Sequence, residues 1–273
     1  MTTTQWRTYY WVARYAARRH AAYPIAGLAE AVTNTVFGFV RAYILIALWR
    51  ARPVLGGYDM TDAVTFCFLT QALIGPVQIF GGLELTERIR TGAVAIDLHR
   101  PVDLQGWWLA DDLGRALLML TLRGGPPLLL GALVFPLRLP GPAGWAAFAV
   151  SVLLGVLVGF GLRYLVALWT FWLHDDRGIQ AVALVLSLFL SGMILPLVVF
   201  PDWLADVARL LPWAALIQVP GDVFLGKAGY FGLTGDAGLL AAYGVQAAWA
   251  LALLLAGRAL TVAARRRLVI HGG

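Results

Sequence analysis

The sequence predicts an all-α, polytopic membrane protein with six transmembrane helices. Hydrophobic residues make up 60% of the 273 positions and charged residues only 13%. The mean hydropathy of +0.76 lies far outside the balance of soluble domains. Six apolar stretches are each long enough for a hydrocarbon core of about 30 Å, which needs about 20 residues of helix. Only short polar pieces separate them, so no soluble catalytic domain of about 100 residues or more fits between the spans.

The first predicted element is an interfacial helix over residues 5–21. Arg7, Arg14 and Arg18 fall on one helical stripe, and aromatic and alanine residues lie roughly opposite. A helix with a basic face and an aromatic face is typical of the membrane surface. This segment is therefore expected to lie along the bilayer rather than across it.

Six transmembrane helices are expected to follow. They are predicted over residues 25–49, 61–83, 109–135, 145–173, 179–200 and 237–264. Gly75-Pro76 predicts a kink or local unwinding inside the second span. Gly155, Gly159 and Gly161 in the fourth span form a small-residue pattern that allows helices to approach closely.

Two longer connections are not expected to span. Residues 84–108 carry mixed charges and a proline that ends any helix, so they must lie outside the hydrocarbon. In residues 201–235, apolar residues recur at helical spacing, but Pro201, Pro212 and Pro220 cut the segment into pieces too short to cross. Short external helices, re-entrant or lying on the surface, are the predicted structure there.

Orientation follows from the positive-inside rule, which assigns the more basic side to the cytoplasm. Most arginines near span ends fall on one side: Arg7, Arg14, Arg18, Arg19, Arg88, Arg90, Arg100, Arg177, Arg265, Arg266 and Arg267. Both termini, residues 84–108 and the turn at 174–178 are therefore expected in the cytoplasm, and residues 201–235 outside. This orientation predicts a multi-pass protein of the cell (inner) membrane, in contact with lipid. The net charge of +6 reflects these topology signals, so we predict no nucleic-acid partner.

One stretch partly matches the sequence pattern of a nucleotide-binding loop. Residues 221–228 (GDVFLGKA) match the GxxxxGK phosphate-binding pattern up to its last position. That pattern needs a Ser or Thr after the Lys to hold magnesium, and a strand leading into a helix. Ala228 replaces the hydroxyl, Pro220 precedes the first glycine, and the predicted topology places the loop outside the cell. We therefore reject the nucleotide site.

No other signature of catalysis is present. His174, Asp175 and Asp176 could be a metal or acid–base cluster, but they occupy a tight turn that requires polar residues in any case. Asp111 and Asp112 at the start of the third span are expected to be interfacial. The sequence predicts no catalytic residue, no cofactor site and no metal site, and hence a chain that is not itself an enzyme.

Three arginines fall within predicted spans: Arg41, Arg123 and Arg163. A central arginine costs about 2.5–3.5 kcal/mol on the insertion scale, so each is expected to face a bundle interior, a wet cavity or an acidic partner. They are the candidate residues of a translocation path for an amphiphilic or anionic cargo. The competing interpretation is that they snorkel to the surface or that the span boundaries shift by a few residues.

Two segments carry a family resemblance. Residues 87–103 (ERIRTGAVAIDLHRPVD) are similar to the I-x-x-G…L-x-R-P segment of the membrane permeases of type 2 ABC exporters. Residues 191–227 resemble the run of that family from its fifth span into its external helices. The layout over nearly the whole chain also resembles that family, from the interfacial helix to the broken helices before the last span.

The resemblance implies a cytoplasmic coupling helix in residues 84–108 that docks on a separate ATPase subunit. The residues it implicates are Glu87, Arg88, Arg90, Gly92, Asp97, Arg100 and Pro101. A short charged helix held rigidly between two spans can transmit a movement of the ATPase to the bundle. Gly92 and Pro101 would fix the ends of this helix. The alternative is a merely solvated loop.

The resemblance also implies the partners. Family members pair two half-bundles, identical or related chains, with two ABC ATPase subunits, which would hold ATP and magnesium in place of this chain. The runner-up is an ATP-independent transport or substrate-binding subunit, which predicts paired interrupted spans and acidic midplane residues. An intramembrane enzyme would need catalytic polar residues at one depth, and the sequence offers no such set.

Overall fold

The computed structural model describes residues 3–22, 24–173 and 177–268. The helices, in order, are α1 (Thr3–Ala21), α2 (Pro24–Ala51), α3 (Met60–Val77), α4 (Glu84–Arg90), α5 (Val94–Leu98), α6 (Leu104–Leu122), α7 (Gly125–Val134), α8 (Pro142–Trp169), α9 (Arg177–Leu190), η1 (Leu197–Val199), α10 (Asp202–Leu210), η2 (Pro212–Ala215), α11 (Gln218–Phe224) and α12 (Gly235–Leu268). No strand longer than an isolated bridge occurs in these ranges. The all-α prediction is confirmed.

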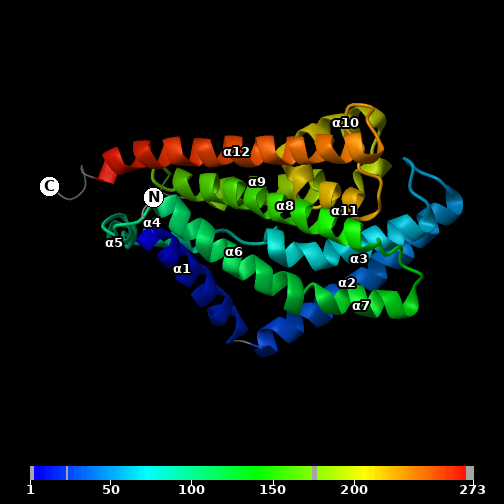
Figure 1. Cartoon of the computed structure of the whole chain (residues 1–273), viewed down its shortest axis with the longest axis horizontal. Helices are drawn as coiled ribbons and strands as arrows, with labels where there is room; N and C mark the ends of the chain where they lie inside the picture. The colour runs from blue at the N-terminus through cyan, green and yellow to red at the C-terminus, as the bar shows by residue number, and fades with distance from the viewer. Residues whose placement is uncertain (1–2, 23, 174–176, 269–273) are drawn as a thin grey trace.

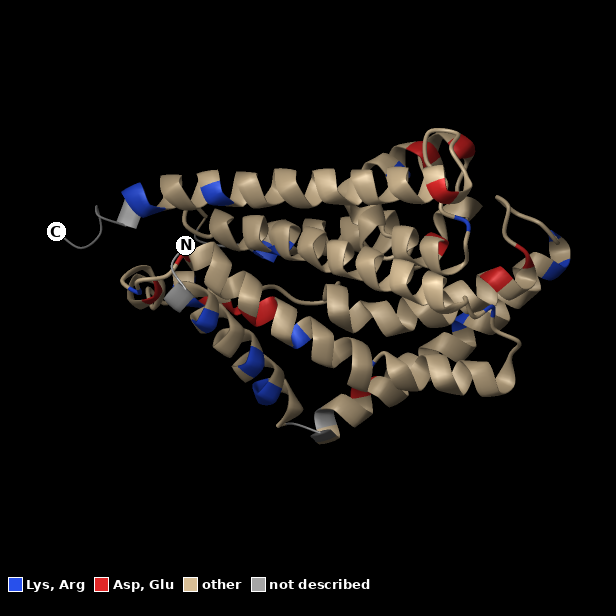
Figure 2. Ribbon diagram, viewed as in Figure 1, with Lys and Arg blue, Asp and Glu red and all other residues tan. Residues whose placement is uncertain are grey.

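The long helices lie side by side in one elongated bundle. Figure 1 shows both chain ends and α4–α5 at one end of its long axis, and α10 with the 52–59 loop at the other. We call these the terminal end and the far end. Helix α8 packs against α12, α11, α3 and α6, so it occupies the centre. Figure 2 shows charged residues gathered towards the two ends, with only a few between them.

Five segments are long and apolar enough to cross a membrane: Gly27–Ala51, Met60–Val77, Leu104–Val134, Pro142–Trp169 and Gly235–Arg266. The chain is therefore a multi-pass membrane protein. The fifth predicted span differs, because residues 179–200 are helical only to Leu190. At 1.5 Å per residue, the 14 residues of α9 reach about 21 Å, less than a hydrocarbon core.

The second predicted span, 61–83, is also shorter in the structure. Helix α3 ends at Val77, where Pro76 provides no backbone N–H and Gln78 adopts a left-handed conformation with φ of 50°. The chain then continues without helix to α4. The expected kink at Gly75-Pro76 is thus the end of the helix.

The third predicted span, 109–135, begins earlier and is broken in two. Asp103 caps α6, its side chain accepting a hydrogen bond from the Gly106 amide. The break falls at Arg123 and Gly124, because Pro126 and Pro127 cannot donate to the preceding turn. In residues 201–235, Pro201 and Pro212 do separate short helices, whereas Pro220 lies in the first turn of α11, where a proline is tolerated.

Helix α1 packs closely on α6 through small residues. Gly106, Ala110 and Gly114 recur every fourth residue on α6, and Gly114 meets the backbone of α1 at Ala13. The predicted basic stripe of α1 is exposed. Of the aromatic residues expected opposite it, Trp6 and Tyr10 are also exposed. Val12 and Ala16 are buried, and the Tyr9 ring lies over Gly106 of α6.

Replacing Gly114 by leucine tests this contact. A Cβ at position 114 would lie 1.9 Å from the carbonyl oxygen of Ala13, so α1 must move away from α6. We expect a loss of about 1–3 kcal/mol of stability, as in other overpacked sites, measured by thermal unfolding in detergent. Gly125→Ala is the matched control, because a Cβ there meets nothing within 4 Å. Equal melting temperatures for the two variants would contradict the close contact.

Candidate functional site

The most buried ionic group of the bundle centres on Asp112 of α6, which is 2% exposed. Arg163 of α8 binds it through two bonds, Nη1 to Oδ1 at 3.0 Å and Nη2 to Oδ2 at 2.8 Å. Arg115, one turn along α6, donates to Oδ1 from Nε at 3.0 Å and from Nη2 at 2.8 Å. One carboxylate therefore accepts hydrogen bonds from two guanidinium groups. Asp112, expected at the interface, is buried within the bundle, and α6 begins five residues earlier than predicted.

Arg115 also closes the end of α3. Its Nη1 donates to the carbonyl oxygen of Gly75 at 2.7 Å and its Nη2 to that of Pro76 at 3.0 Å. Carbonyls at a helix C-terminus have no helical donor and carry partial negative charge, so a guanidinium satisfies both needs. Arg163 reaches the same place, because its Nη1 donates to Gln78 Oε1 at 2.8 Å. The arginine pair thus ties α3, α6 and α8 together where α3 stops.

Sequence reasoning missed Arg115. The available signal was its position three residues after Asp112, a spacing that places opposite charges on one helix face. The predicted span of 109–135 placed both residues near its start, where charged side chains are expected at the membrane surface.

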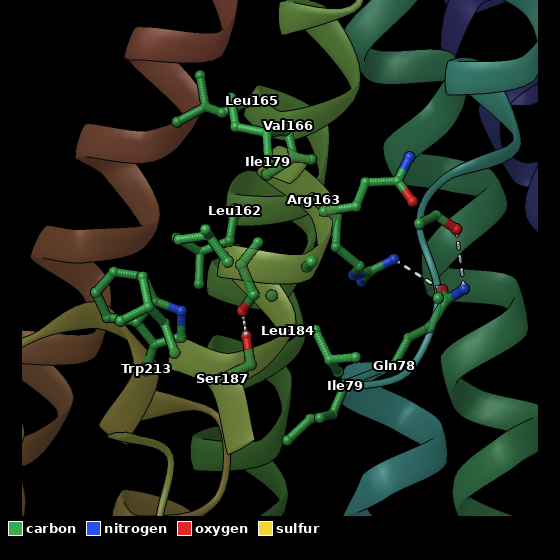
Figure 3. Close-up of a pocket in the computed structure, with 18 of the residues that line it drawn as sticks. Gln78, Ile79, Leu162, Arg163, Leu165, Val166, Ile179, Leu184, Ser187 and Trp213 are labelled. Atoms are coloured by element: carbon green, nitrogen blue, oxygen red, sulfur yellow. Dashed lines mark hydrogen bonds between the residues drawn. The ribbon is translucent and has the colours of Figure 1, made fainter. Parts of the chain in front are cut away.

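Two cavities meet at this group. An apolar cavity of about 400 Å³ lies between residues 77–82, α8 and α9, and Arg163 is part of its wall. A polar cavity of about 510 Å³ is lined from α1, α4 and α6, and includes Asp112 and Arg115. Gln78, Gly82 and Gln180 line both cavities, so the two adjoin. Figure 3 shows the Arg163 guanidinium reaching towards Gln78, with Leu162 and Trp213 on the opposite side.

The other two intramembrane arginines are engaged elsewhere. Arg41 Nη2 donates to the carbonyl oxygens of Met193 and, at 2.9 Å, Ile194, just beyond the end of α9. Arg123 forms an ion pair with Glu30 of α2. Of the three path candidates, Arg163 lines one of these two cavities, and Arg41 and Arg123 line neither.

The loop at 84–108 is a braced structure rather than a loose connection. Arg88 of α4 binds Asp97 of α5 through Nε and, at 2.8 Å, through Nη2. The hydrogen-bonded Asp97 carboxylate raises the pKa of Arg88, which therefore stays charged at any physiological pH. Arg100 adds a second contact to Asp97 at 3.2 Å. Leu85 and Val94 are fully buried beneath the loop and anchor it to α8 and α6.

The remaining predicted coupling residues face outward. Glu87 and Arg90 pair with each other at the edge of the polar cavity, with both side chains more than half exposed, and Pro101 is exposed. Gly92 turns the chain between α4 and α5 with φ of 76°, a conformation that favours glycine. Beside them Ile96 is 65% exposed, which the sequence did not single out. The seven residues therefore divide into a brace (Arg88, Asp97 and Arg100) and an outer surface.

At the far end, Lys227 is held inside the fold. Its Nζ binds Asp62 and the carbonyl oxygen of Gly57. Gly221 lies within α11, with no strand before it. Lys227 is thus a structural contact between the segment after α11 and the start of α3, in keeping with rejection of the nucleotide site.

Among the described residues, no group of three or more His, Cys, Asp or Glu side chains is placed to hold a metal ion. His174, Asp175 and Asp176 lie outside the described residues. Nothing in the described part of the chain therefore points to metal chemistry in the bundle.

Comparison with known proteins identifies the family. A family model described as "ABC-2 family transporter protein" matches residues 36–272, most of the chain. Neither the curated proteins nor the solved structures contain a match. Permeases of this family are generally non-catalytic and work with ABC ATPase partners. The chain therefore belongs to the ABC-2 transporter family, as a membrane permease of the type 2 ABC class.

Proposed function

We propose that the chain is the permease subunit of an ATP-driven exporter. With a second half-bundle, identical or related, it forms the translocation path for an amphiphilic cargo. Separate ATPase subunits, which bind ATP and magnesium, dock on α4–α5 and drive it. The observation that carries this proposal is the braced α4–α5 unit, which projects from the terminal end of the bundle (Figure 1).

The α4–α5 unit is built to transmit force. Its two helices are locked to each other by Arg88 and Asp97, and to the bundle by buried leucine and valine side chains. Helix α4 follows directly after residues 78–83, which border the Asp112 group. Arg19 of α1 also binds Glu84 at 3.2 Å. A displacement of α4 would therefore move the end of α3 and α1 together.

The proposal includes a membrane topology with six passes. Helix α9 and the broken segment through α11 together make a sixth pass, so that the two termini share one side. That side is cytoplasmic by the arginine distribution, and the membrane is the inner cell membrane. Irregular backbone at membrane depth is tolerated where protein covers it. Arg41 supplies such cover at the carbonyls after α9.

Ile96→Asp tests the docking surface. An exposed apolar side chain can anchor an interface, and an aspartate buried there by the partner would have no counter-charge. We expect the tagged permease to recover about tenfold less of its ABC ATPase from native membranes, which corresponds to about 1.4 kcal/mol. Recovery is measured by quantitative mass spectrometry of the purified complex.

Val54→Asp is the matched control, because Val54 is 70% exposed and lies in the loop at the far end. It should leave ATPase recovery unchanged. Recovery of no ABC ATPase with the unaltered permease would refute the proposal. Equal recovery with both variants would remove α4–α5 as the docking surface.

An ATP-independent transporter is the second candidate. Helix α3 stops early, α6–α7 is broken, and α9 is short, and discontinuous helices are a feature of secondary transporters. Cargo movement by the reconstituted chain without ATPase or ATP would favour this alternative. Dependence on both would favour the exporter.

A further inference from the structure

We propose that the two cavities form one binding site for an anionic amphiphile, with its apolar tail between α8 and α9 and its anionic group beside Arg163 and Arg115. This inference rests on the proposed transport function and names its cargo class. The structure places an apolar space and a polar space against each other, with the arginine pair at the junction. A molecule that fills both must be apolar at one end and charged next to it.

The sign of the charge follows from the ion pairs. Asp112 is the sole carboxylate bound by both Arg115 and Arg163 in the described structure, so positive charge exceeds negative charge within this group of three side chains. The α3 carbonyls bound by Arg115 offset only part of it, since a helix end carries about half a negative charge. A buried net charge is unfavourable in a membrane protein and marks a functional site. An anionic ligand would remove it.

The charges on the opposite side of the polar cavity indicate where the anion binds. There, Arg19 pairs with both Glu84 and Asp111, so two carboxylates share one arginine. The two carboxylates repel an anion from Arg19, and the arginine pair attracts it to the junction. Arg90, which is paired with Glu87, and Arg177 also line this cavity. An anion at the junction lies directly next to the apolar cavity, as the headgroup of an amphiphile does.

Arg163 also has an unused donor. Its side chain is 90% buried, with 10% exposed, and its Nε finds no acceptor in the described part of the chain. Orphaned buried N–H groups are rare in folded proteins. Arg163 forms part of the apolar cavity wall, so a small shift of its side chain would bring this donor to an oxygen of a ligand headgroup at the junction.

The apolar cavity suits a tail in size and lining. Its volume of about 400 Å³ falls in the range of about 300–1,000 Å³ typical of small-molecule sites. Leu162, Val166, Leu184 and Trp213 contribute apolar walls, and Figure 3 shows Leu162 and Trp213 on the side of the space away from Gln78. Tail and headgroup thus meet separate surfaces.

A fluorescence titration tests the proposal on the purified full chain in a neutral maltoside detergent. The probe is 11-(dansylamino)undecanoic acid, compared with its methyl ester, which has the same tail and no charge. We expect the acid to bind at least about tenfold more tightly than the ester. Dodecyl phosphate should displace the acid, and inorganic phosphate at the same concentration should not.

Variants assign the two halves of the site. Arg163→Gln should abolish the preference for the acid, and Arg163→Lys should keep part of it. Leu184→Trp narrows the apolar cavity and should weaken acid and ester alike. Arg123→Gln removes an intramembrane arginine outside both cavities and should change neither affinity. Thermal unfolding shows whether each variant is folded. If Arg163→Gln does not fold, the acid–ester comparison on the unaltered chain and the Leu184→Trp variant still test the proposed site.

Equal binding of acid and ester by the unaltered chain would overturn the proposal. So would an undiminished acid preference in a folded Arg163→Gln variant, or displacement by inorganic phosphate as effective as by dodecyl phosphate. ATPase recovery is measured on the same variants. Loss of probe binding with recovery intact would refute the cargo class alone, whereas probe binding without any recovered ATPase would refute the ATP-driven exporter alone.

Discussion

Asp112→Asn is expected to destabilise the bundle by about 3–5 kcal/mol, the cost of leaving buried charges without a partner. The substitution preserves the shape of the side chain but removes the only negative charge that Arg115 and Arg163 share in the described structure. Without the carboxylate, two buried guanidinium groups lie next to each other with no negative side chain between them. The measurement is thermal unfolding in detergent, with expression level as a second readout.

Asp111→Asn is the matched control for this prediction. Asp111 is the preceding residue of the same helix, but it pairs with Arg19 at 3.2 Å, and the Arg19 side chain is half exposed. Ion pairs of this kind contribute about 0–1 kcal/mol. Similar stability losses at positions 111 and 112 would mean that burial does not distinguish the two carboxylates.

Asp97→Asn is expected to loosen α4–α5 and uncouple the permease from ATP hydrolysis. Asp97 is 2% exposed in its side chain and binds Arg88 and Arg100 at once. Its loss should cost the local unit about 1.5–3 kcal/mol, because Arg88 and Arg100 remain partly exposed to solvent, while the bundle remains folded. We therefore expect increased hydrogen exchange in residues 84–101, an unchanged main unfolding transition, and a loss of ATPase stimulation by the permease.

Glu87→Gln separates this effect from a general loss of charge. Glu87 pairs with Arg90 on the surface, and both side chains are more than half exposed. The removal of that pair should cost about 0–1 kcal/mol and leave hydrogen exchange as it was. Full ATPase stimulation by Asp97→Asn would show that the brace is not needed for coupling.

These two sites also explain why Arg88 is a poor residue with which to test docking. The sequence marks Arg88 and Arg90 as equal members of one charged segment. In the structure Arg88 is the brace and Arg90 belongs to the surface. A change at Arg88 would remove partner binding by deforming the loop, whichever surface the partner contacts.

The sequence by itself determined the fold class, the family and the approximate position of most membrane helices. These features depend on local properties: the length of an apolar run, the prolines at 201 and 212 that divide short helices, and the charges that exclude a segment from hydrocarbon. The spacing of the glycines of α8 predicts close packing of helices. In the structure Gly155 approaches the carbonyl of Ala215 and Gly161 approaches Leu253.

Only the tertiary structure decided which arginines border a cavity and which close a helix end. Arg41, Arg123 and Arg163 look alike in sequence, each a single cation within an apolar run. Their difference lies in partners that are far away along the chain: carbonyls after α9, a glutamate of α2, and an aspartate of α6. A buried charge takes its role from whatever group it meets across the bundle, and that meeting depends on how the helices pack.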